Sequence, residues 1–93
     1  MKIPNRIKIK NKFVEITYQE GFVCGKHFGT YDPNTNVITI AAELEGHKKL
    51  ETYLHEAIHS ISHHYNLKIT EKQTEGLDGP LTKLVEQLLS LNE

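Results

Sequence analysis

The chain of 93 residues lacks the features of several protein classes. Its one cysteine, Cys24, has no partner for an internal disulfide, which excludes a disulfide scaffold and favours a reducing compartment such as the cytoplasm. No apolar run approaches the roughly 18 residues that a membrane span needs, so we expect no membrane partner. The net charge is −1, and a chain this close to neutral has no overall field that favours nucleic acid.

The positive charge is concentrated at the N-terminus. Residues 1–12 carry five basic side chains and no acidic one. Lysine alternates there with isoleucine, which is typical of a strand with one solvated face. The segment contains no aromatic residue on which a base could stack. We therefore expect an exposed strand in this segment and no nucleic-acid partner.

Short segments of β type make up the first half of the chain. The alternation of apolar and polar residues over 6–18 predicts a hairpin, with its turn at residues 11–12. Residues 22–31 contain two glycines, follow a third at Gly21, and are expected to form an irregular strand or a loop. Turn-forming residues fill positions 32–36. The β-branched residues at 37–40 then predict a further strand.

The second half of the chain has helical periodicity. Apolar residues recur every three or four positions and predict a helix over about residues 47–64. Thr70 and Gln73 have the spacing of a capping box, which predicts the start of a second helix. The leucines of this second helix keep their phase past Pro80, so we expect a kink at the proline and not a new helix.

The order of these elements indicates the fold class. Strands that come first and helices that come second predict an α+β fold, with a small antiparallel or mixed sheet followed by two helices. A chain of this length is long enough for one hydrophobic core and too short for two. We therefore expect residues 1–93 to form a single domain.

Histidine is concentrated in one part of the first predicted helix. Four of the six histidines lie in the segment HEAIHSISHH, residues 55–64. Within it, His55, Glu56 and His59 fit the motif HExxH, and residues four apart lie on the same face of a helix. Two imidazoles can therefore bind one Zn²⁺ ion from a rigid platform, with Glu56 beside them as a general base for water.

A catalytic zinc site needs a third protein ligand and an open position for water. His63 lies four residues after His59 and would reach the same ion only with strain along a straight helix. Acidic residues of the second helix are better candidates, but Glu71 lies in the first turn, where the helix dipole favours an acid without any metal. Glu75 lies a full turn further in, where packing would fix its position. We predict Glu75 as the third ligand, with Glu71 and His63 as alternatives.

Cys24 and His27 form the pattern C-x-x-H, which is half of a zinc knuckle. No second pair of ligands accompanies it, so we expect no separate zinc site here. The cysteine is interpreted as a buried free thiol.

Residues 52–89 resemble the small phage-type zincin-like metallopeptidases. The segment LHEAIH at 54–59 is similar to the metal-binding helix of that family, and Leu67 to the leucine of the loop that follows. The segment TEKQTE at 70–75 is similar to the start of its capped second helix. Residues 29–40, with the pattern G-x-Y-x-P-x-x-N-x-I-x-I, are similar too, so the resemblance extends over nearly the whole chain.

This resemblance implies a minimal zincin-like fold and the zinc-dependent hydrolysis of peptide bonds in a protein or peptide substrate. His55, His59 and Glu75 would be the zinc ligands, as in gluzincins, and Glu56 would accept the proton of the attacking water. The strand at 37–40 would be the sheet edge along which an extended substrate pairs. The alternative is a binding module of the same fold that acts through protein–protein contacts. Glu56 favours the enzyme, because a purely structural metal site needs no base beside its ligands.

Overall fold

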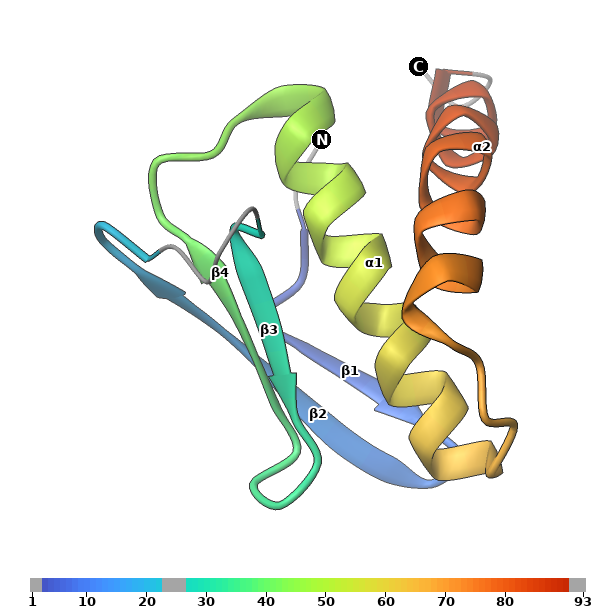
Figure 1. The fold of residues 1–93 in the computed structure, drawn as a ribbon. Coiled ribbons are helices and arrows are strands. Elements are labelled where there is room, and N and C mark those ends of the chain that lie inside the picture. Colours follow the sequence, from blue (N-terminus) through green and yellow to red (C-terminus); the bar gives the residue numbers. More distant parts are fainter. Residues whose placement is uncertain (1–2, 23–26, 91–93) are drawn as a thin grey trace.

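The computed structural model describes residues 3–22 and 27–90 (Figure 1). A four-stranded mixed sheet is followed by two helices, which confirms the predicted α+β class. The first helix packs against the sheet and the second packs against the first. The elements are β1 (Arg6–Ile9), β2 (Lys12–Gln19), β3 (Gly29–Asp32), β4 (Val37–Ala41), α1 (Gly46–Tyr65) and α2 (Glu71–Ser90).

The predicted N-terminal hairpin is formed by β1 and β2. They pair antiparallel with Ile9 opposite Lys12, so Lys10 and Asn11 make a two-residue turn. Both turn residues have positive φ, 46° and 64°. Positive φ at both central residues is the geometry of a type I′ turn, which matches the twist of the two strands. The hairpin is thus confirmed, and its turn lies one residue earlier than predicted.

The strand order β1-β2-β4-β3 places β4 inside the sheet. β4 pairs in parallel with β2 on one side and antiparallel with β3 on the other. The expectation that residues 37–40 form a free sheet edge is therefore wrong. The reason is that the glycine-rich segment before it contains β3, which pairs with β4 and takes the edge position next to α1.

The hydrophobic core lies between the sheet and α1. Val14, Ile38 and Ile40 are fully buried, and Tyr53 of α1 packs against them from the helix side. The core therefore fixes α1 against β4, and with it the position of the HExxH motif relative to the sheet.

α1 begins and ends within one residue of its predicted bounds, and α2 begins where the capping box predicts it. α1 ends where Asn66 adopts left-handed backbone with φ of 56° and donates its N–H to the carbonyl of His63. α2 begins with the predicted capping box: the N–H of Thr70 donates to Gln73 Oε1 at 2.9 Å, and the N–H of Gln73 donates to Thr70 Oγ1 at 3.1 Å. α2 then continues through Pro80 without a break, so no new helix begins there.

The two helices leave an apolar groove between them. Leu77 and Leu84 of α2 are about half exposed in this groove. Its full lining is Ile58, Ile61, Ile69, Leu77, Pro80, Leu81 and Leu84. Despite this apolar surface, neither helix in the described part of the chain has a stretch long and apolar enough to cross a membrane.

Candidate metal centre

The HExxH residues line a cleft between α1, β3 and the start of α2. His55 and Glu56 are buried, with 7 % and 4 % of their surface exposed, and His59 is partly exposed. The cleft has a volume of about 450 Å³ and is bounded on its other side by residues of β3 and on α2 by Glu71. The helical spacing of the motif thus brings both histidines and the glutamate to one cleft, as predicted.

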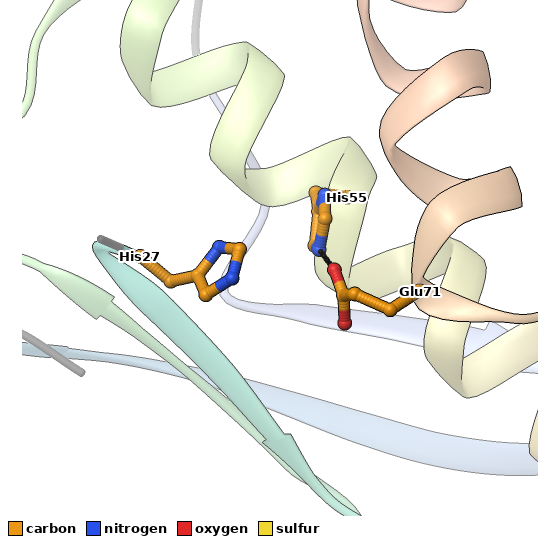
Figure 2. Close-up of side chains that lie close together, drawn as sticks. All are labelled: His27, His55 and Glu71. Carbon is orange, nitrogen blue, oxygen red and sulfur yellow. Dashed lines mark ion pairs between the residues drawn. The ribbon is translucent and has the colours of Figure 1, made fainter. Parts of the chain in front are cut away.

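The carboxylate of Glu71 lies between the two histidines of the motif. Its Oε1 is 2.7 Å from Nε2 of His55, and its Oε2 is 3.1 Å from Nε2 of His59. Figure 2 shows this carboxylate pointing from the start of α2 at the His55 ring. Two imidazole nitrogens that contact the same carboxylate offer the ligand types that zinc accepts. Glu71, one of the two alternatives left by the sequence, is therefore the acid that meets the motif.

Two local interactions hold Glu71 at this position. The hydroxyl of Ser62, in the last turns of α1, accepts the N–H of Ile69 at 2.8 Å and fixes the loop between the helices. The capping box at Thr70 then starts α2 at the next residue. The first turn of α2 is thereby held beside the turns of α1 that carry the histidines.

Glu75 and His63, the other candidates for the third ligand, lie elsewhere around the site. Glu75 is one turn further along α2 and lines a neighbouring pocket of about 80 Å³ together with Glu56 and Asp78. His63 lines the main cleft one turn beyond His59, where its ring packs against Tyr31 with centroids 6.1 Å apart.

His27 brings a further imidazole to the site from the sheet. Its ring centroid lies 5.5 Å from that of His55, and ligand atoms of His27, His55 and Glu71 all lie within 4.8 Å of one another. Figure 2 shows the His27 ring projecting from just before β3 towards His55 and Glu71. Sequence spacing assigned His27 only to half of a zinc knuckle with Cys24, which lies outside the described residues.

Asp78 holds the other nitrogen of His55. Its Oδ2 lies 2.8 Å from Nδ1 of His55, and the Asp78 side chain is largely buried. A carboxylate at Nδ1 holds a proton on that nitrogen, so Nε2, which contacts Glu71 here, is the nitrogen that would bind a metal. Burial lowers the pKa of His55, but the hydrogen bond to Asp78 and the charges of Glu56 and Glu71 outweigh it, so the pKa is raised. Asp78 belongs to no sequence motif, so its place beside His55 could not be predicted from the sequence.

Glu56 is a carboxylate with unusual acid–base properties. Burial raises its pKa from 4.5 to about 7; the nearby His55 charge opposes this shift and Glu71 adds to it. The backbone of β3 comes close behind it, because a Cβ added at Gly29 would lie 3.3 Å from Glu56 Cγ. A group whose pKa lies near neutrality can both accept and return a proton during a reaction at that pH.

No family model, curated protein or solved structure matches this chain. Its function is therefore inferred from the site itself.

Proposed function

We propose that the chain is a zinc-dependent metallopeptidase of the zincin-like type. The observation that carries the proposal is the contact of one carboxylate, that of Glu71, with Nε2 of both His55 and His59, in a cleft that Glu56 also lines. Two histidines and one glutamate are the ligand types of a catalytic zinc site with a position left for water. In this proposal Glu71 takes the role that the sequence assigned to Glu75.

A zinc ion held by these residues supplies Lewis acidity, which lowers the pKa of water towards about 7 and polarises a peptide carbonyl. The side chains of the protein would transfer the protons and orient the metal ligands. Glu56 would accept the proton of the attacking water and return it to the leaving amine, the usual role of a general base. Asp78 keeps the proton of His55 on Nδ1, so that Nε2 offers its lone pair to the metal.

The substrate strand would pair along β3. This strand is the edge of the sheet beside α1, and its residues Gly29, Thr30 and Tyr31 line the cleft with the metal ligands. An extended peptide that adds to this edge gains backbone hydrogen bonds and places a carbonyl near the metal centre. β3 thus takes the role that the sequence assigned to residues 37–40.

The alternative is a non-catalytic binding module, and this alternative does not explain why Glu56 is buried. A buried carboxylate that must lose its proton in a desolvated place destabilises the folded protein. A module that acts only through its surface gains nothing from this cost. The burial of Glu56 therefore favours the enzyme over the binding module.

The test is the cleavage of a degenerate peptide library by the zinc-loaded protein, followed by mass spectrometry. Wild type should cleave, and Glu56→Gln should bind zinc equally well and cleave at least about 100-fold more slowly, the usual loss of a general base. Glu51→Gln, on the same helix, is the matched control and should cleave like wild type. A zinc-loaded wild type without cleavage, or an active Glu56→Gln, would overturn the peptidase and favour the binding module.

A further inference from the structure

We propose that His27 is a fourth protein ligand of the zinc site, which then rests with three imidazoles and one carboxylate around the ion. This inference deepens the proposed function and rests on it. It assigns a role to a residue that lies outside the HExxH helix and outside the capped second helix.

The distances of the cluster suit a common metal ion. The ligand atoms of His27, His55 and Glu71 lie within 4.8 Å of one another. Ligands at 2.0–2.1 Å from a tetrahedral zinc ion are themselves about 3.3 Å apart, so movements of about 1 Å would bring this cluster to bonding distance. His55 is buried, so the movement falls to the half-exposed Glu71 side chain and the partly buried His27 side chain, for which small rotations are enough.

The surroundings of His27 leave its ring available to a metal. The ring lies against His55, and no hydrogen bond joins a His27 nitrogen to another residue within 3–22 and 27–90. It lines both the main cleft and the smaller pocket on either side of His55, so it has space to turn. The backbone next to it is anchored, because the carbonyl of Phe28 accepts the N–H of Ala41 at 2.8 Å.

A fourth protein ligand changes what the site does at rest. Zinc sites with four protein ligands are structural, whereas catalytic sites keep one position for water. With His27 bound, the zinc site is closed, and hydrolysis begins only when His27 leaves the metal. A peptide that pairs along β3 would arrive beside His27, the ligand that must leave before water can bind.

The experiment compares wild type, His27→Ala and His63→Ala as full-length chains. Proton NMR of the Co²⁺-substituted protein counts coordinated imidazoles, and competition with a chromogenic chelator measures zinc affinity. Wild type should show three coordinated imidazoles and His27→Ala two, with zinc affinity reduced by at least the roughly 10- to 100-fold typical of a lost outer-sphere partner. His63→Ala removes a histidine from the same cleft and should keep three imidazoles and the wild-type affinity.

Each contrary outcome has a distinct meaning. Two coordinated imidazoles in wild type, with equal zinc affinity in His27→Ala, would overturn the role of His27 and leave the proposed peptidase site intact. A wild type that binds neither Co²⁺ nor Zn²⁺ would overturn the proposed function itself. The imidazole count of wild type decides the question even if His27→Ala fails to fold.

Discussion

Glu56 should make the zinc-free protein less stable as the pH rises towards neutrality. Burial raises the pKa of Glu56 from 4.5 to about 7 in the folded state. Between these pH values the folded protein keeps the proton that the unfolded chain has lost, so the unfolded state binds fewer protons and the free energy of unfolding falls with rising pH. At about 1.4 kcal/mol per pH unit, the total loss is about 3 kcal/mol by pH 8.

Glu56→Gln isolates this effect, because glutamine has nearly the same shape and no charge. We expect the zinc-free variant and wild type to be equally stable near pH 4, and the variant to be more stable by about 3 kcal/mol at pH 8. Denaturant unfolding in the presence of a chelator, repeated across this pH range, measures the difference. Glu20→Gln removes an exposed carboxylate and controls for net charge. Parallel stability curves for wild type and Glu56→Gln would refute the reasoning, since Glu56 would then titrate like an exposed glutamate.

Three further substitutions test the surroundings of the site. Gly29→Ala places a Cβ 2.8 Å from Thr52 Cγ2 and should lower the free energy of unfolding by about 1–3 kcal/mol in denaturant titrations; an unchanged midpoint would contradict the close approach of β3 to α1. Asp78→Asn should weaken zinc binding by roughly 10- to 100-fold in a chelator competition, because the anchor of His55 loses its charge. Equal affinity would show that this anchor is dispensable. Thr70→Ala removes one half of the capping box and should cost about 1 kcal/mol, detectable as a lower melting temperature; no change in melting temperature would argue against the box.

The parts of the site that depend on spacing within one helix could be predicted from the sequence. His55, Glu56 and His59 share a cleft because the i, i+4 spacing puts both histidines on one face of α1. The start of α2 could be predicted for a similar reason, since the capping box at Thr70 is a local pattern.

The parts that depend on how distant elements pack could not be predicted. Glu71 and Glu75 are four residues apart and share a face of α2, so spacing alone does not distinguish them. Which of the two glutamates meets the histidines depends on the loop between the helices. Ser62 fixes this loop, and the loop holds the first turn of α2 beside the histidines. His27 reaches the site only because β3 lies at the sheet edge beside α1, and an alternating pattern of residues does not specify strand order.

The most direct test of the metal centre is the zinc content of wild type, Glu71→Gln and Glu75→Gln after dialysis against a slight excess of zinc. The two variants remove one carboxylate each from the same helix face, so they are matched in charge and helix propensity. We predict one zinc ion per chain in wild type and Glu75→Gln and a strong loss in Glu71→Gln. Zinc retained in Glu71→Gln and lost in Glu75→Gln, or a wild type without zinc, would contradict the proposed centre.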